Sequence, residues 1–179
     1  MNLANRLTLA RIFLVPIFMI ILLTRIPKYG DYLAAIIFII AASTDGLDGY
    51  IARSRKQITN LGKFMDPLAD KLLISAALIS LVELGLIKAW VAIIIISREF
   101  AVTGLRAIAA GEGIVIAASK LGKYKTVSQI AAIIAILLHD FSFSLFHMPL
   151  GSIILYIAMI LTIVSGIDYF IKAKKLFKK

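Results

Sequence analysis

Six long apolar stretches dominate this 179-residue chain and limit what it can fold into. A helix needs about 20 mostly apolar residues to cross the hydrocarbon core of a bilayer. Hydrophobic residues make up 61% of the chain, against about 45–50% in typical soluble domains. The sequence therefore predicts an all-α integral membrane protein with six transmembrane helices. These stretches cover roughly residues 7–26, 32–53, 62–86, 89–109, 126–146 and 150–171.

The positions of the basic residues predict how the bundle is oriented. Cytoplasmic segments of membrane proteins carry an excess of Lys and Arg. If six spans alternate in direction, only Arg25, Lys28 and Lys88 fall on one side, and the other 17 of the 20 basic residues fall on the side that holds both termini. We therefore expect both termini in the cytoplasm. The loops are short, so residues 1–179 are predicted to form a single membrane domain.

Charge and cysteine content exclude several classes of function. The net charge of +10 is spread over several juxtamembrane segments, which favours contact with anionic lipid over binding of nucleic acid. The chain has no cysteine, so a disulfide framework, a thiolate metal site and a cysteine nucleophile are all excluded.

Four aspartates mark the junction between the second and third spans. Asp45 and Asp48 lie near the end of one span, and Asp66 and Asp70 lie near the start of the next. Side chains three or four residues apart share a helix face, so each helix offers a pair of carboxylates. The short connection at 54–61 makes the two helices antiparallel neighbours, which can bring the four acids together. Acids within membrane segments are costly and usually functional.

Four carboxylates in one place would repel each other unless cations neutralised them. Oxygen ligands without nearby His or Cys suit hard divalent ions such as magnesium, manganese or calcium. The small residues Gly49, Ala52 and Gly62 stand within one turn of the acids, where they leave room for a ligand or for the other helix. The alternative is that the acids are interfacial residues paired with nearby basic side chains, namely Arg53, Arg55, Lys63 and Lys71.

The same residues carry a resemblance to a known family. The pattern Asp45-x2-Asp48-Gly49-x2-Ala52-Arg53-x8-Gly62-x3-Asp66-x3-Asp70 resembles the complete signature of the CDP-alcohol phosphotransferases in residue type and spacing. Residues 5–11, NRLTLAR, are similar to the opening helix of that family. The segments ISREFAVTGLRAIAAGEG and ASKLGKYKTVSQ look like those of the bacterial phosphatidylglycerophosphate synthases within it. The resemblance covers residues 2–132.

This resemblance implies an enzyme of phospholipid biosynthesis. It would transfer a phosphatidyl group from CDP-diacylglycerol to glycerol 3-phosphate, giving phosphatidylglycerophosphate and CMP. The expected protein is a homodimer in a bacterial-type cell membrane, with its active site facing the cytoplasm. Another acceptor, such as serine or inositol phosphate, stays open within the family, and a divalent-cation transporter is the alternative outside it.

The resemblance also implies roles for individual residues. Asp45, Asp48, Asp66 and Asp70 would bind two divalent cations, Mg²⁺ or Mn²⁺, and Asp70 would also act as the general base. The residues expected around the nucleotide are Thr8, Arg11, Asp48, Gly49, Ala52, Arg53, Gly62 and Asp66.

Basic residues in the later segments are candidates for the acceptor phosphate. Arginine and lysine are the usual protein partners of phosphate groups, and the candidates here are Arg106, Lys123 and Lys125. The alternative is that these residues only determine membrane topology.

Charged residues also occur within the apolar stretches themselves. Arg98 and Glu99 lie in the middle of the fourth span. Adjacent residues on a helix do not face each other, so each is expected to need a partner on another helix. A structural polar network and an acceptor-site role are equally compatible with this position. Glu83 and Asp168 are further acids whose role the sequence leaves open.

Overall fold

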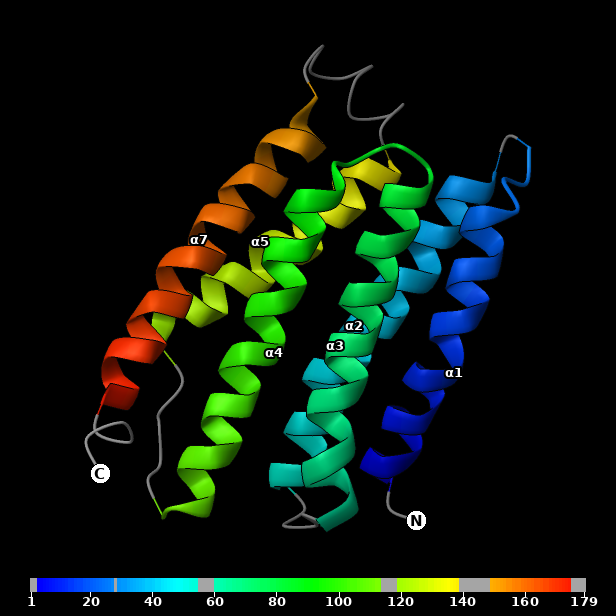
Figure 1. Cartoon of the computed structure of the whole chain (residues 1–179). Helices are drawn as coiled ribbons and strands as arrows, with labels where there is room; N and C mark the ends of the chain where they lie inside the picture. Colours follow the sequence, from blue (N-terminus) through cyan, green and yellow to red (C-terminus); the bar gives the residue numbers. More distant parts are fainter. Residues whose placement is uncertain (1–2, 28, 55–59, 114–118, 139–148, 175–179) are drawn as a thin grey trace.

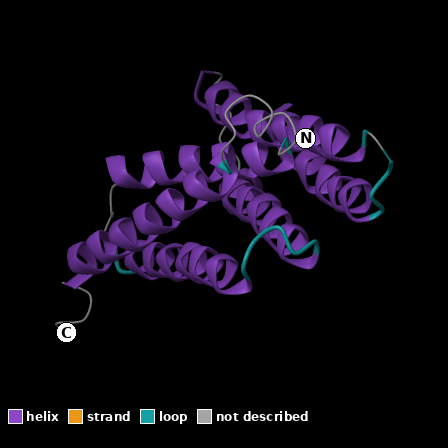
Figure 2. Ribbon diagram, turned by 90° about the horizontal axis from the view of Figure 1, so that it is seen from above, coloured by secondary structure: helices purple, strands orange, loops and turns teal. Residues whose placement is uncertain are grey.

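The structure is a computed structural model that describes residues 3–27, 29–54, 60–113, 119–138 and 149–174. For residues 3–5, 45–54 and 60–67 only the helical backbone is described. Within these ranges the chain consists of helices and loops, without a β-strand (Figure 2). The six helices are α1 Leu3–Leu23, α2 Gly30–Ser54, α3 Asn60–Glu83, α4 Ala89–Gly111, α5 Lys120–Leu137 and α7 Leu150–Lys172.

Successive helices run in opposite directions along the bundle (Figure 1). The start of α1 and the end of α7 therefore lie toward the same end. Each of the six predicted apolar stretches overlaps one helix, so the all-α prediction is confirmed for the described part of the chain. The end of α2 and the start of α3 lie at the end that also holds the start of α1 (Figure 1).

Apolar side chains fill the inside of the bundle. Phe18 of α1 and Phe38 of α2 are fully buried, with their ring centroids 5.7 Å apart. Leu78 of α3, Ile95 of α4 and Ile133 of α5 are also fully buried in the same core. Close packing of these side chains holds the helices together through many small van der Waals contacts.

The outer surface of the bundle is also apolar. Phe13 of α1, Ile93 of α4 and Ile171 of α7 are 68%, 62% and 66% exposed. Large exposed apolar surfaces on a folded chain mark contact with lipid or with another protein.

Two helices in the described part of the chain are long and apolar enough to cross a membrane on their own. They are Arg6–Leu23 within α1 and Leu150–Lys172, which is α7; Gly30–Thr44 in α2 is a shorter apolar stretch. Helices α4 and α5 each carry three charged residues, which lowers their affinity for lipid. The six-span topology with cytoplasmic termini therefore stays a prediction.

The predicted start of the fifth span, residue 126, was wrong. The helix begins at Lys120, because Ser119 caps it: the Ser119 Oγ accepts a hydrogen bond from the Gly122 N–H at 3.0 Å. A serine cap satisfies one of the free N–H groups at a helix start, and lysine is a good helix former. The helix ends at Leu137, and residues 139–146 lie outside the described part.

Helices α5 and α7 approach each other closely at Gly151. A Cβ atom at Gly151 would lie 2.6 Å from Ile136 Cγ1 and 2.8 Å from the backbone nitrogen of Ile136. The absence of a side chain at Gly151 therefore lets the start of α7 cross the end of α5.

Candidate active site

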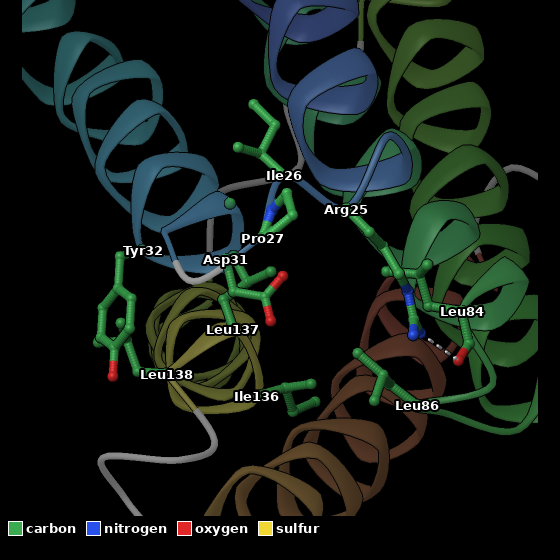
Figure 3. Close-up of a pocket in the computed structure, with 11 residues that line it drawn as sticks. Arg25, Ile26, Pro27, Asp31, Tyr32, Leu84, Leu86, Ile136, Leu137 and Leu138 are labelled. Carbon is green, nitrogen blue, oxygen red and sulfur yellow. Dashed lines mark hydrogen bonds between the residues drawn. The ribbon is translucent and has the colours of Figure 1, made fainter.

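One hollow lies at the end of the bundle where α1 ends and α2 begins (Figure 3). Its volume is about 370 Å³. Arg25 forms part of its wall and donates a hydrogen bond from Nη2 to the carbonyl oxygen of Leu84 at 3.5 Å. Of the described residues that line it, none belongs to the predicted site.

The second hollow, which we call the Asp70 pocket, has a volume of about 510 Å³ and opens between α3, α4, α5 and α7. It brings together Asp70 and all three residues predicted to bind the acceptor phosphate, although they come from three different helices. Its polar lining comprises Asp70, Lys71, Arg98, Glu99, Thr103, Arg106, Ser119, Lys123, Lys125, Thr126 and Tyr169.

Glu99 and Lys125 form an ion pair across the Asp70 pocket, between α4 and α5. Lys125 is only 4% exposed. A buried ammonium group needs a carboxylate partner, since burial of an unpaired charge is very costly. Lys125 is therefore a buried, paired part of the pocket wall, and its role in binding the acceptor phosphate stays a prediction.

Arg98 has partners on α7. Its Nη2 donates a hydrogen bond to Ser165 Oγ at 2.9 Å, and its guanidinium carbon lies 5.5 Å from the centre of the Tyr169 ring. Its Nη1 also lies 3.5 Å from Glu99 Oε1. The prediction that Arg98 and Glu99 each need a partner on another helix is confirmed. Both side chains belong to a polar network that lines the pocket, and an acceptor-site role for them stays a prediction.

The lining of the Asp70 pocket is rich in positive charge. Five cationic side chains face two carboxylates: Lys71, Arg98, Arg106, Lys123 and Lys125 against Asp70 and Glu99. Arg106 and Lys123 are exposed, so their charged ends are open to a ligand. A concave surface with an excess of positive charge attracts anions. The pocket therefore suits a small anionic ligand beside the carboxylate of Asp70.

Arg11, one of the two residues predicted on α1, contacts α2 just before Asp45. Thr8 and Arg11 are both buried. Arg11 Nε donates a hydrogen bond to Thr44 Oγ1 at 3.1 Å, and Thr44 precedes Asp45 in the chain. The polar face of α1 thus packs against the acidic end of α2, where the nucleotide is predicted to bind.

The remaining predicted residues lie in helical backbone whose side chains fall outside the described part. They are Asp45, Asp48, Gly49, Ala52 and Arg53 in α2 and Gly62 and Asp66 in α3.

The helical backbone at these positions agrees with the expectation that Asp45 and Asp48 share a face, as do Asp66 and Asp70. Among the side chains that are described, no group of three or more His, Cys, Asp or Glu gathers as a metal site would require. The four-aspartate metal site stays a prediction, and its donor set contains only oxygen, which suits Mg²⁺ or Mn²⁺.

Two further acids lie away from the Asp70 pocket. Glu83, the last residue of α3, is exposed. Asp168 accepts a hydrogen bond from Lys172 at 2.6 Å, one turn further along α7. Neither residue is among those that line the pocket.

The contribution of α7 to the pocket was not predicted from the sequence. Tyr169 lines it, and Ser165 holds Arg98. A signal was present in the sequence: Thr162, Ser165 and Tyr169 follow each other at helical spacing in an otherwise apolar segment, and all three are buried. A polar stripe of this kind on a membrane helix indicates a face that packs against other polar helices.

Comparison with known proteins gives the same family as the one that the aspartate signature indicated. The sequence profile of the CDP-alcohol phosphatidyltransferase family matches residues 1–164. The chain therefore belongs to this family of enzymes. The match extends beyond residue 132, where the resemblance had been expected to end.

Three relatives illustrate the similarity. A Bacillus subtilis (strain 168) protein named CDP-diacylglycerol--glycerol-3-phosphate 3-phosphatidyltransferase is 54% identical, over 96% of this chain and 94% of its own length. A protein of the same name from Haemophilus influenzae is 42% identical, over 97% and 94%. The Mycobacterium tuberculosis (strain ATCC 25618 / H37Rv) protein named "Probable phosphatidylglycerophosphate synthase" is 39% identical, over 96% and 81%.

Proposed function

We propose that this chain transfers the phosphatidyl group of CDP-diacylglycerol to glycerol 3-phosphate, giving phosphatidylglycerophosphate and CMP. The observation that carries the proposal is the Asp70 pocket, in which a carboxylate of the family signature lies in one hollow with Arg106 and Lys123. Such a pocket can hold a phosphorylated alcohol with its phosphate on the cations and a hydroxyl near the acid. The names of the relatives support the same acceptor.

The proposed reaction is a single displacement at phosphorus. A hydroxyl oxygen of glycerol 3-phosphate forms a bond to the phosphorus that carries the diacylglycerol, while the bond from that phosphorus to the oxygen of CMP breaks. Asp70 takes the proton of the attacking hydroxyl, and CMP leaves with the electron pair of the broken bond. General-base assistance of this kind typically contributes about 10²- to 10⁴-fold to the rate.

The proposal includes two divalent cations, Mg²⁺ or Mn²⁺, held by Asp45, Asp48, Asp66 and Asp70. When bound, such ions neutralise the pyrophosphate charge and stabilise the charge that develops during displacement. Thr8 and Arg11 would line the nucleotide pocket, and Gly49, Ala52 and Gly62 would leave room for the cytidine. Arg53 would provide a positive charge beside the leaving CMP.

The proposed setting is a bacterial cell membrane that all six helices cross, with both termini and the active site in the cytoplasm. The alternating helices, the exposed apolar outer surface and the distribution of basic residues support this orientation. By similarity to the family, we propose that the protein acts as a homodimer.

Identification of the lipid product tests the proposal. Purified protein is supplied with CDP-diacylglycerol, Mg²⁺ and one alcohol at a time: glycerol 3-phosphate, serine or inositol phosphate. We expect CMP release and a phosphatidylglycerophosphate product only with glycerol 3-phosphate, and loss of both when EDTA removes the metal.

Other outcomes of this assay would each contradict a defined part of the proposal. A product with serine and none with glycerol 3-phosphate would retain the family chemistry and overturn the acceptor. Full activity in EDTA would overturn the metal site. Metal uptake into liposomes that lack any lipid substrate, without CMP release, would favour a transporter.

Replacement of Arg106 by Gln tests the acceptor-phosphate site. A hydrogen bond to a charged group contributes about 1.5–3 kcal/mol, so we expect the KM for glycerol 3-phosphate to rise about 10- to 100-fold. The KM for CDP-diacylglycerol should stay within about 2-fold, since neither Thr8 nor Arg11, the predicted nucleotide residues whose side chains are described, lines the pocket that holds Arg106. Initial-rate kinetics with each substrate varied in turn measure both constants.

Arg25→Gln is the matched control for this variant, because it removes a guanidinium from the hollow at the other end of the bundle. It should leave both KM values unchanged. An unchanged KM for glycerol 3-phosphate in Arg106→Gln would show that Arg106 does not bind the phosphate.

A further inference from the structure

Tyr169 of α7 is a buried residue that contacts two other helices at the Asp70 pocket. It is 4% exposed. Its hydroxyl accepts a hydrogen bond from the backbone N–H of Ser119 at 3.0 Å, and its ring lies beneath the guanidinium of Arg98, 5.5 Å from the ring centre. One side chain on α7 therefore touches both the start of α5 and the middle of α4.

The contact with Ser119 attaches the start of α5 to α7. Ser119 is the N-cap of α5, so a hydrogen bond to its backbone holds the end of the helix. A Cβ atom on Gly122 would lie 3.5 Å from the Tyr169 hydroxyl oxygen, which shows that the first turn of α5 packs directly against that hydroxyl. Lys123 and Lys125 stand within the first two turns, so their positions depend on this attachment.

The contact with Arg98 is a second link between Tyr169 and Lys125. The ring of Tyr169 and the hydroxyl of Ser165 hold the guanidinium of Arg98. Arg98 Nη1 lies 3.5 Å from Glu99 Oε1, and Glu99 is paired with Lys125. Among the described atoms, the buried Nε of Arg98 has no hydrogen-bond partner, so the aromatic ring and Ser165 are important for keeping this side chain in place.

The packing of α7 leaves little freedom for Arg98 to move. A Cβ atom on Gly166 would lie 3.1 Å from Arg98 Cγ, so the side chain of Arg98 lies directly on the backbone of α7. Arg98 is thus held between Gly166, Ser165 and Tyr169, all of which are buried.

We propose that Tyr169 is a positioning residue for the anionic acceptor. It acts through Ser119 and Arg98, which place the cations of α4 and α5 around the acceptor phosphate, and it therefore determines the affinity for glycerol 3-phosphate but not for CDP-diacylglycerol. This inference rests on the proposed function of the Asp70 pocket.

The test uses two variants that remove the contacts separately. Tyr169→Phe removes the hydroxyl and keeps the ring under Arg98; Tyr169→Leu removes both. A neutral hydrogen bond typically contributes a factor of about 2 to 10, so we expect Tyr169→Phe to raise the KM for glycerol 3-phosphate about 5-fold. Tyr169→Leu also loses the cation–π contact, and its KM should rise about 30-fold.

Tyr156→Phe is the matched control, because Tyr156 is an exposed tyrosine of the same helix whose ring lies 6.1 Å from that of Trp90. It should leave both KM values unchanged. In both Tyr169 variants the KM for CDP-diacylglycerol should stay within about 2-fold, and Tyr169→Phe should keep the melting temperature of the wild type.

Three kinds of result would show whether the role of Tyr169, its positioning effect or the proposed function is wrong. An active wild type with an unchanged KM for glycerol 3-phosphate in Tyr169→Phe would overturn the role of Tyr169 alone. Equal rises in both KM values, or a lower melting temperature with both KM values unchanged, would show a merely structural role. A wild type that releases no CMP with glycerol 3-phosphate would contradict the proposed function itself. If Tyr169→Leu does not fold, Tyr169→Phe still decides the question.

Discussion

Replacement of Asp70 by Asn should lower kcat for CMP release by about 10³-fold, the typical contribution of a general base. Asparagine has almost the same shape as aspartate, but it can neither accept the proton of the acceptor hydroxyl nor offer a negative charge to a cation. Asp70 lies half-buried on α3 and faces the pocket that holds Arg106, Lys123 and Lys125. The measurement is steady-state release of CMP at saturating concentrations of both substrates and of Mg²⁺.

Asp168→Asn is the control for this variant, because it makes the same chemical change at a surface aspartate that pairs with Lys172. It should retain wild-type turnover. The melting temperature of Asp70→Asn should remain close to that of the wild type, so that lost activity is not mistaken for lost folding. Normal turnover in Asp70→Asn at limiting metal would remove Asp70 from the reaction.

Replacement of Gly151 by Ala should lower the free energy of unfolding by about 3 kcal/mol, the upper part of the usual range for overpacking. The added Cβ would stand 2.6 Å from Ile136 Cγ1 and 2.8 Å from the Ile136 backbone nitrogen. A side-chain atom can move aside, but the backbone of α5 cannot do so without shifting the whole helix. The melting temperature in detergent, followed by the fluorescence of the single tryptophan, measures the effect.

The same change at Gly111 should be harmless or slightly stabilising. Gly111 is the exposed last residue of α4, and among the described residues, apart from its chain neighbours and the nearby backbone of α4 itself, no atom would lie within 4 Å of an added Cβ. Alanine has a higher helix propensity than glycine, so a loss of stability at Gly151 must come from the helix contact. Equal melting temperatures for Gly151→Ala and the wild type would mean that α5 and α7 are further apart than the structure shows.

Much of the fold could be predicted from local properties of the sequence. Long apolar stretches predict helices, and the three- and four-residue spacing of the aspartates places them on shared faces. The start of the fifth helix was predicted too far along the chain, because Lys120, Lys123 and Lys125 are typical of a loop at a membrane surface. In the structure they belong to a helix that Ser119 caps.

Much less of the pocket could be predicted, because its contacts join residues that are far apart in the chain. Glu99 and Lys125 are 26 residues apart, Ser119 and Tyr169 are 50 apart, and Arg98 and Ser165 are 67 apart. Which of these pairs meet depends on how the helices cross and how far each is shifted along its axis. The sequence indicated only that Arg98 and Glu99 needed partners.

The sequence by itself determined the family, the six helices and the four aspartates at the junction of two of them. Composition and helical periodicity are local properties, so they can be read without knowing which helices are neighbours. Only the tertiary structure decided that Asp70 faces the cations of α4 and α5, that Lys125 is buried against Glu99, and that α7 closes the pocket with Tyr169. These pairings follow from close helix crossings at small residues such as Gly151 and Gly166. The geometry of a crossing depends on the residues of both helices together.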